Sequence, residues 1–188
     1  LQSIFKTHNI QKFRAKQLID YIYHRYIFDF EDMTQFPKDL RQWLGDNCVI
    51  SLPTLITESI APDGKTRKIL VEMSDQSRVE AVLMEQHYGY SVCVSSQVGC
   101  AMGCVFCAST QGGLYRDLTV AEIIGQVVIF GALTKEEIHS VVVMGAGEPL
   151  QNYDNVLQAL QLLHDPMICN ISYRKMTIST CGWVPNIY

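Results

Sequence analysis

The sequence lacks any apolar run that approaches the length of a transmembrane helix, so we expect no membrane-spanning segment. It also lacks a charged start followed by an apolar stretch and a cleavage site, and therefore shows no secretion signal. No internal repeat or low-complexity segment is visible. Hydrophobic residues make up 48% of the 188 positions, which is enough for a packed core and argues against wholesale disorder.

A disulfide framework is also missing, because the seven cysteines are odd in number and three of them stand within eight residues. Free thiols are typical of a reducing compartment, so we expect the protein in the cytoplasm. The net charge of −4 is unevenly spread, since residues 1–28 carry five basic residues and one acidic residue. A basic end on an acidic protein suggests contact with nucleic acid, although a solvated helix face is the commoner reason for such charges.

The first 50 residues predict a small helical module. A helix is expected over Gln11–Tyr26, a short one over Phe30–Met33 and a third after Pro37. The apolar stripe expected on the first of these helices consists of Phe13, Leu18, Ile22 and Tyr26.

From residue 54 onward the pattern changes to short runs rich in β-branched residues, separated by turns. Residues 51–92 therefore predict an antiparallel meander, with strands at Leu55–Ile60, Thr66–Glu72, Val79–Glu85 and Tyr88–Ser95. Residues 93–188 alternate strand and helix, which predicts parallel strands joined by helical crossovers. The elements expected there are a helix opened by a capping box at Thr119–Glu122, a strand at His139–Met144, a helix at Asn152–Leu163 and a strand at Lys175–Thr180.

Three cysteines, Cys100, Cys104 and Cys107, form the most informative pattern in the chain. Thiolates this close on one loop can bind a single inorganic centre, and three of them suit a cubane iron–sulfur cluster with one iron free for another ligand. A closed structural zinc site requires four ligands, so that alternative needs a histidine such as His87. Three buried small apolar residues are the remaining alternative. We also expect Phe106 to cover the centre and exclude water.

A second pattern is Gly145-Ala-Gly147-Glu148-Pro149. It follows a predicted buried strand, so it lies at the carboxyl edge of the sheet, where ligands of α/β proteins bind. The third glycine of a dinucleotide fingerprint is missing, because Leu150 occupies its place. The motif still offers exposed glycine backbone and one carboxylate, which could bind the ammonium group of a ligand. The alternative is that it forms an ordinary strand-to-helix turn with no ligand.

The cysteine spacing, with an aromatic residue before the last cysteine, resembles that of the radical S-adenosylmethionine (SAM) superfamily. Three sequence motifs are similar to motifs of the bacterial dual-specificity 23S rRNA/tRNA adenosine carbon-2 methyltransferases: Cys93-Val-Ser-Ser-Gln-Val-Gly-Cys100, Met144-Gly-Ala-Gly-Glu-Pro149 and Thr177-Ile-Ser-Thr180. The resemblance implies an α/β fold in which residues 93–188 form the first half of a partial (β/α) radical-SAM barrel. We therefore expect a fragment that lacks the C-terminal part of the family.

The same resemblance assigns roles to individual residues. It implies that a 4Fe–4S cluster is held by Cys100, Cys104 and Cys107, and that SAM is bound by Gly147, Glu148 and Ser179. Cys93 corresponds to the cysteine that resolves a covalent enzyme–RNA adduct, and Glu80 to the proton acceptor. Three further cysteines match no motif and are interpreted as packing residues: Cys48, Cys169 and Cys181.

The implied reaction is methylation of carbon 2 of adenosine, an electron-poor carbon that a radical can attack although a polar methyl transfer has no good path to it. By resemblance, one SAM methylates a cysteine of the enzyme, and a second is cleaved to a radical that takes hydrogen from this methyl group. The methyl-carrying cysteine of the family lies beyond Tyr188, so no residue here is assigned that role. The implied partners are 23S rRNA and tRNA, with residues 1–50 as a candidate RNA-binding module, and a flavodoxin-type electron donor. We expect a monomer.

Other functions stay open. The related adenosine carbon-8 methyltransferases of the antibiotic-resistance type share the cluster, the cofactor and the cysteine chemistry, but the Gly147-Glu148-Pro149 and Gln97-Val98-Gly99 motifs favour carbon 2. An RNA-binding module with a structural metal site and no catalysis is a second alternative, supported by the missing methyl carrier. A different radical-SAM enzyme that shares only the cysteine loop is disfavoured, because the sequence matches the family in motifs at several separate positions.

Overall fold

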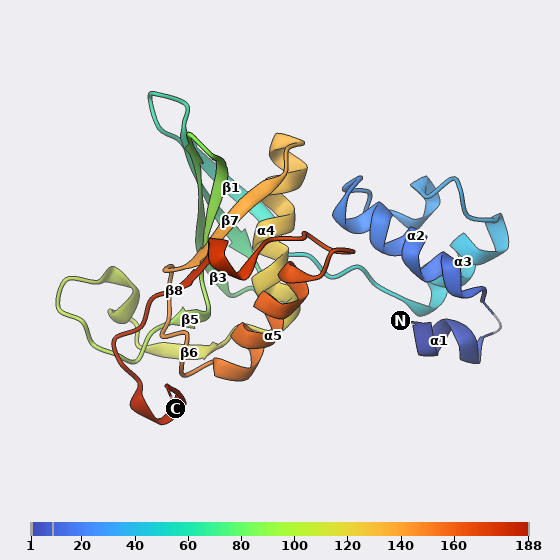
Figure 1. The fold of residues 1–188 in the computed structure, drawn as a ribbon. Coiled ribbons are helices and arrows are strands. Elements are labelled where there is room, and N and C mark those ends of the chain that lie inside the picture. The colour runs from blue at the N-terminus through green and yellow to red at the C-terminus, as the bar shows by residue number, and fades with distance from the viewer. Residues whose placement is uncertain (1, 9, 188) are drawn as a thin grey trace.

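The N-terminal part of the chain is a small helical module with a core of its own. The computed structural model describes residues 2–8 and 10–187. The helices of the module are α1 (Gln2–Thr7), α2 (Lys12–Tyr23) and α3 (Lys38–Asn47), with a short 3-10 helix, η1 (Phe30–Asp32), before α3 (Figure 1). The module core consists of Phe5, Ala15, Leu18, Tyr21, Met33, Phe36 and Leu44.

The apolar stripe predicted for α2 is wrong in part. Leu18 is buried as predicted, but Phe13 is 49% exposed, and Ala15 and Tyr21 are buried instead. Tyr26 lies beyond the end of α2, has a φ of 54° and packs against the core of the main body. The helix ends three residues earlier than predicted, so the helical period does not extend to Tyr26.

The main body is built on one six-stranded mixed sheet, in the order β1-β2-β3-β4-β7-β8. The predicted antiparallel meander is formed by β1 (Thr54–Ile60), β2 (Thr66–Glu72), β3 (Arg78–Gln86) and β4 (Gly89–Val94). In parallel with β4 lies β7 (Ile138–Val143), and in parallel with β7 lies β8 (Met176–Ile178). The prediction of parallel strands after an antiparallel meander is therefore confirmed, and all six strands share one sheet.

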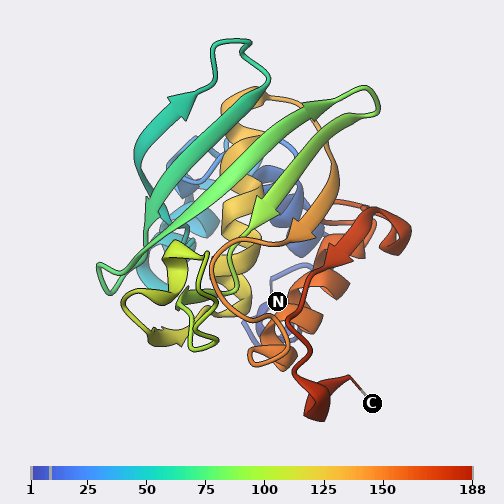
Figure 2. The ribbon, with the colours of Figure 1, turned by 90° about the vertical axis from the view of Figure 1, so that its left-hand side faces the viewer.

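Two helices, α4 (Val120–Thr134) and α5 (Tyr153–His164), cover one face of this sheet (Figures 1 and 2). The predicted capping box opens α4, because Thr119 accepts a hydrogen bond from the backbone of Glu122 and the Glu122 side chain reaches back to Thr119. Most of α4 is apolar and buried, since the sheet lies on one side of it and the helical module on the other. Within the described ranges, no helix is long and apolar enough to cross a membrane.

The parallel pairing of β4 and β7 brings two loops to the same edge of the sheet. Residues 95–99 follow β4 and residues 144–149 follow β7, and backbone hydrogen bonds join the two loops. The N–H groups of Ser96 and Gln97 donate to the carbonyl of Ala146 at 2.9 and 3.1 Å, and the N–H of Gly145 donates to the carbonyl of Val94 at the end of β4 at 3.0 Å. At this edge a separate two-stranded sheet, which the sequence pattern did not predict, is formed by β5 (Gln97–Gly99) and β6 (Leu114–Asp117).

Candidate cofactor and catalytic site

The three predicted thiols lie on one loop, residues 100–113, whose ends are held together by β5 and β6. Cys100 begins the loop, and its backbone N–H donates to the carbonyl of Gly113 at 3.0 Å. Gly99 permits this closure, because its φ is 75° and a Cβ at this position would collide with the Gly113 carbonyl. The cysteines therefore belong to a loop that is closed at its base.

The loop thiols line one cavity of about 310 Å³, which we call the thiol cavity. Its wall includes all six residues that the sequence predicted for cluster and cofactor binding: Cys100, Cys104, Cys107, Gly147, Glu148 and Ser179. The first three come from the loop, and the others from the carboxyl ends of β7 and β8. Segments that are distant in the sequence thus meet at one edge of the sheet.

Phe106 lines the thiol cavity, as the sequence led us to expect, but it does not seal the cavity from water. Its side chain is 90% exposed, and the neighbouring Val105 is fully exposed. Both residues belong to the cysteine loop, which projects from the body of the protein (Figure 2). By contrast Cys100 is buried, and Cys104 and Cys107 are half-buried.

The donor set fits an iron–sulfur cluster better than zinc. In the described part of the chain, no three His, Cys, Asp or Glu side chains converge closely enough to hold a metal ion. A zinc site needs ligands about 2.0–2.3 Å from a single point. His87 lies in the turn between β3 and β4, at the other end of β4, and does not line the thiol cavity. A cubane cluster carries each thiolate on a different iron, so thiols spread around a cavity suit it.

Glu148 is only 3% exposed, and its carboxylate accepts three hydrogen bonds. Oε1 accepts from the N–H of Leu150 at 2.9 Å and from Oγ1 of Thr180 at 2.7 Å, and Oε2 accepts from the N–H of Cys181 at 2.8 Å. Burial alone would raise the pKa of Glu148, but these bonds outweigh it and hold the pKa below its usual range. An ionised carboxylate with acceptor capacity left on Oε2 suits an ammonium group of a ligand.

Gly147 and Ser179 complete this side of the thiol cavity. Gly147 has a φ of 108°, and a Cβ there would lie 2.6 Å from Oγ of Ser96 and 2.7 Å from Cβ of Gln97. A larger residue therefore has neither the conformation nor the space that this position requires. Ser179 directly follows β8, and its N–H donates to the carbonyl of Val143 at 3.3 Å.

A second cavity of about 420 Å³, which we call the strand cavity, is lined by Glu80 and Cys93. Val82 pairs with Cys93 across β3 and β4. Because side chains alternate along a strand, Glu80 and Cys93 point to the same face of the sheet, the one that α4 and α5 leave open. The strand cavity and the thiol cavity share four wall residues: Cys107, Ser109, Met144 and Gly145. The predicted catalytic residues thus lie next to the predicted cofactor residues.

The two side chains of the strand cavity differ in environment. Glu80 is 56% exposed, and its Oε1 lies 2.9 Å from Nζ of Lys68. Cys93 is half-buried, and burial raises the pKa of its thiol, so the thiol is protonated at neutral pH. The cavity therefore offers a carboxylate that can take a proton and a thiol that can attack sulfur once it loses its own proton.

Comparisons with known proteins agree with this geometry. A family model described as the radical SAM superfamily matches residues 94–187, the part of the chain that holds the cysteine loop and the ends of β7 and β8. The chain belongs to the radical SAM superfamily. A second family model, described as the N-terminal domain of ribosomal RNA large subunit methyltransferase, matches residues 1–50. The cofactors of radical SAM proteins are a 4Fe–4S cluster and SAM, as the cysteine spacing led us to expect.

The chain is also similar to proteins named probable dual-specificity RNA methyltransferase RlmN. It is 49% identical to the one from Symbiobacterium thermophilum over 178 aligned residues. The aligned region makes up 94% of this chain and 48% of that protein. It is 44% identical over 187 residues to one from Clostridium perfringens, covering 100% and 54% respectively. A crystal structure of a radical SAM methyltransferase from Sphaerobacter thermophilus matches with a TM-score of 0.91 and 35% identity, over 98% of this chain and 55% of that one.

The resemblance inferred from the sequence motifs and the partial radical-SAM fold are thus both confirmed. The chain spans about half the length of the curated relatives it matches. The roles of the individual site residues are not tested by these similarities and stay predictions.

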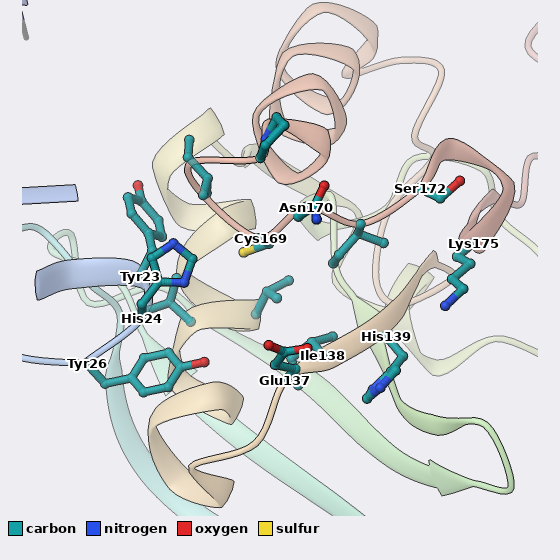
Figure 3. Close-up of a pocket in the computed structure, with 15 residues that line it drawn as sticks. Tyr23, His24, Tyr26, Glu137, Ile138, His139, Cys169, Asn170, Ser172 and Lys175 are labelled. Carbon is teal, nitrogen blue, oxygen red and sulfur yellow. The ribbon is translucent and has the colours of Figure 1, made fainter. Parts of the chain in front are cut away.

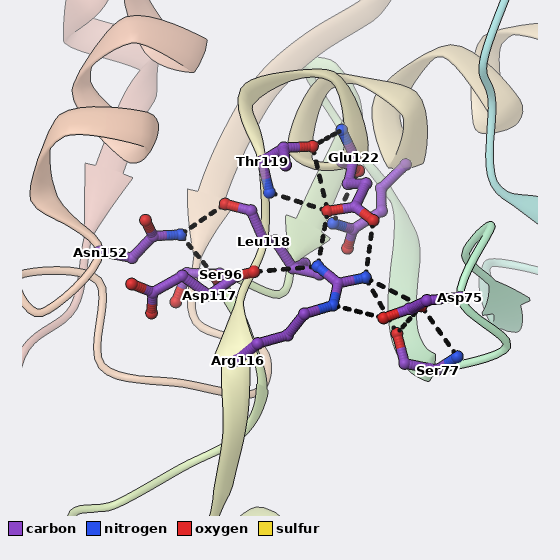
Figure 4. A network of polar contacts seen from close by, with 10 residues as sticks. Asp75, Ser77, Ser96, Arg116, Asp117, Leu118, Thr119, Glu122 and Asn152 are labelled. Atoms are coloured by element: carbon purple, nitrogen blue, oxygen red, sulfur yellow. Dashed lines mark hydrogen bonds and ion pairs between the residues drawn. The ribbon is translucent and has the colours of Figure 1, made fainter.

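Arg116 anchors the exit of the radical SAM cysteine loop, a role that the sequence did not reveal (Figure 4). Its guanidinium contacts Oδ2 of Asp75 at 2.6 Å and Oε1 of Glu122 at 2.8 Å. The hydrogen bonds from Arg116 and Ser77 hold the pKa of Asp75 well below its usual range. Two carboxylates thus neutralise the charge of Arg116. Arg116 therefore ties β6 to the β2–β3 turn and to the start of α4.

Asn152, just before α5, joins the entrance of the cysteine loop to its exit (Figure 4). It is 3% exposed, and its Nδ2 donates to the carbonyl of Ser96 at 2.7 Å and to that of Leu118 at 2.8 Å. Both carbonyls are far from Asn152 in the sequence, so no local pattern predicts these bonds.

Replacing Asn152 with alanine is expected to lower the free energy of unfolding by about 1–3 kcal/mol, because the carbonyls of Ser96 and Leu118 each lose a hydrogen bond and Ser96 keeps the one from the N–H of Leu118. Chemical denaturation measures this loss. Gln158→Ala, at an exposed position on α5, is the matched control and should change the stability little. Equal stabilities of the Asn152 and Gln158 variants would contradict the anchoring role of Asn152.

Cys181 is not the packing residue that the sequence suggested. It is exposed and lines the thiol cavity. The pKa of its thiol is raised to about 11, first by a hydrogen bond to Glu148, and further by burial and by the charges of Glu148 and Cys104. The position of Cys181 directly after the Thr177–Thr180 motif was the one sequence signal that could have placed it at the site. Cys48 and Cys169 are half-buried and pack against the two cores, as interpreted.

A third cavity, of about 320 Å³, lies between the helical module and the main body (Figure 3). Its lining includes Tyr23 and Tyr26 from the module, and Glu137 and His139 at the amino end of β7. None of the predicted site residues lines it. The thiol cavity lies at the carboxyl end of β7, so this third cavity is separate from it.

Proposed function

We propose that this chain is the cluster- and cofactor-binding part of an enzyme that methylates carbon 2 of adenosine in 23S rRNA and tRNA. The observation that carries the proposal is the wall shared by the thiol cavity and the strand cavity. A cofactor held among the loop thiols would lie next to the carboxylate of Glu80 and the thiol of Cys93. The names of the relatives, dual-specificity RNA methyltransferases, support the same reaction class.

The cofactor residues have distinct tasks in this proposal. Bound cluster and SAM supply the radical chemistry that the electron-poor carbon 2 of adenine requires. Glu148 accepts a hydrogen bond from the ammonium group of SAM, while the backbone at Gly147 and the side chain of Ser179 orient the cofactor. The cluster is held by Cys100, Cys104 and Cys107.

Cys93 and Glu80 act on the RNA. In this proposal the methyl group reaches adenine through a cysteine of the complete protein, outside this chain, so that enzyme and RNA are joined through sulfur. Glu80 takes the proton from carbon 2, and the thiolate of Cys93 attacks this sulfur and forms a disulfide. The sulfur–carbon bond breaks, and its electron pair passes to the bridging methylene, which takes up a proton and becomes the methyl group of the product. Both residues must face the substrate from one wall, and β3 and β4 place them on the same face of the sheet.

The RNA and the electron donor approach from different parts of the molecule. Lys12 and Lys16 are exposed on α2, and we propose the helical module as the RNA contact. The target base must leave its stack, which loop RNA permits at least cost. The exposed part of the cysteine loop at Val105 and Phe106 leaves the thiol cavity accessible to a flavodoxin-type reductant. We propose that the enzyme acts as a monomer in the cytoplasm.

The test uses the complete protein, reconstituted with iron and sulfide without oxygen and incubated with a reductant, SAM and a 23S rRNA fragment. The wild type should release 5′-deoxyadenosine and methylate the RNA. Cys93→Ala should stop with RNA covalently attached, and Glu80→Gln should turn over more slowly. Cys48→Ala, whose thiol packs in the helical module, is the control and should behave as the wild type. Absence of 5′-deoxyadenosine from the wild type would instead favour a non-catalytic RNA-binding module.

A further inference from the structure

The thiol cavity contains one more thiol than the three of the cysteine loop. Cys181 lies in the turn after β8 and lines the same cavity. Its side chain is exposed rather than packed in a core. Cys181 and Cys104 line this cavity together, although they are 77 residues apart in the sequence. Four thiols from two separate segments therefore face one cavity.

The turn that carries Cys181 is anchored to Glu148, the residue proposed to bind the ammonium group of SAM. The N–H of Cys181 donates to Oε2 of Glu148 at 2.8 Å, and Oγ1 of Thr180 donates to Oε1 at 2.7 Å. The next residue, Gly182, has a φ of 93° and no atom within 4 Å of the place that a Cβ would take. The turn is thus tied to the cofactor site on one side and has open space on the other.

We propose that Cys181 is a fourth thiolate ligand of the cluster, binding the iron that the three loop cysteines leave free while SAM is absent. This rests on the proposed function, because it requires that Cys100, Cys104 and Cys107 hold the cluster. The thiol gives its proton to solvent when it binds iron and recovers it when SAM takes its place. No electron is transferred in this exchange. Because the backbone N–H of Cys181 donates to the carboxylate that is proposed to bind the ammonium group of SAM, the Cys181 thiol lies next to the place where SAM enters.

Such a ligand would protect the cluster between turnovers. Cubane clusters are commonly held by four cysteines, and an iron without a thiolate is the one most easily lost. When ferricyanide takes an electron from a cubane held by three thiolates, the cluster releases this iron as Fe²⁺ and leaves a three-iron cluster. A thiolate from Cys181 would slow the release, and bound SAM would make that protection unnecessary.

The experiment oxidises the reconstituted complete protein with ferricyanide and follows the EPR signal of the three-iron cluster together with the iron released. Without SAM, Cys181→Ala is expected to convert several-fold faster than the wild type. With saturating SAM the two proteins should convert at the same rate. Cys48→Ala, which removes a thiol from the module core, is the matched control and should behave as the wild type under both conditions.

Equal conversion rates of wild type and Cys181→Ala without SAM would overturn the fourth-ligand proposal and leave the proposed function intact. A wild-type protein that assembles no cluster would overturn both. Cys181 is exposed, so its replacement by alanine should leave the fold unchanged, and a thermal melt of the variant checks this.

Discussion

In protein that already carries Cys181→Ala, replacing Cys104 with serine is expected to abolish assembly of the iron–sulfur cluster. A serine hydroxyl keeps its proton at neutral pH and is a poor ligand for iron, so only two loop thiolates would remain. The Cys181→Ala background prevents the fourth thiol of the cavity from taking the place of Cys104. Nearly all of the visible absorption, iron and sulfide found after reconstitution should be lost. The exchange alters a single side-chain atom at a half-buried position, so the fold should persist.

The control for this experiment is Cys48→Ser in the same background. Cys48 is half-buried as well, but it packs against the module core, away from the thiol cavity. The control should assemble the cluster normally. A full cluster in the Cys104→Ser protein would contradict the assignment of the loop cysteines as cluster ligands.

Replacing Glu148 with glutamine is expected to weaken both the fold and the binding of SAM. The carboxylate accepts hydrogen bonds from two backbone N–H groups and the hydroxyl of Thr180, and each bond to a charged group contributes about 1.5–3 kcal/mol. Glutamine places an NH₂ group where one of these donors needs an acceptor. We expect a loss of about 2–4 kcal/mol in the free energy of unfolding, measured by denaturation. Affinity for SAM should fall at least about tenfold, measured by equilibrium binding, since the charged partner of the ammonium group is gone.

Acid should reduce this difference in stability. The pKa of Glu148 is lowered in the folded protein, so its contribution is present above the ordinary carboxyl range and is lost as the pH falls through it. Wild type and Glu148→Gln should therefore approach each other in stability at low pH. Glu85→Gln, on an exposed position of β3, is the matched control and should bind SAM as the wild type does. Unchanged binding by Glu148→Gln would show that Glu148 does not contact the cofactor.

The sequence predicted the elements whose signals are local. The Thr119–Glu122 capping box sets the start of α4 through contacts between neighbours in the chain, and the β-branched runs of the meander set β1 to β4. By contrast, β5 and β6 are only three and four residues long and pair across the whole cysteine loop. No periodicity can develop over so few residues, so their pairing was not predictable.

The candidate site shows the same division. Most of the predicted residues of the two cavities could be proposed from the sequence because they belong to recognisable motifs, whereas Glu80 came only from the family resemblance. The partners of Arg116 could not, since Asp75 is 41 residues away and is brought to it only by the fold. Phe106 was expected to cover the centre and exclude water. It lines the thiol cavity, but its side chain is 90% exposed and therefore does not seal the cavity. Cys181 joins the site because β8 ends at Ile178, a boundary that the sequence placed two residues later.

The central claim is tested most directly by nucleoside mass spectrometry of 23S rRNA and tRNA. The RNA would come from cells that lack the gene for this protein, with the complete wild-type protein or its Cys93→Ala variant restored. The account predicts 2-methyladenosine with the wild type, and none without the protein or with the variant. Appearance of 8-methyladenosine instead would contradict the carbon-2 assignment, and the absence of any change in methyladenosine would contradict RNA methylation itself.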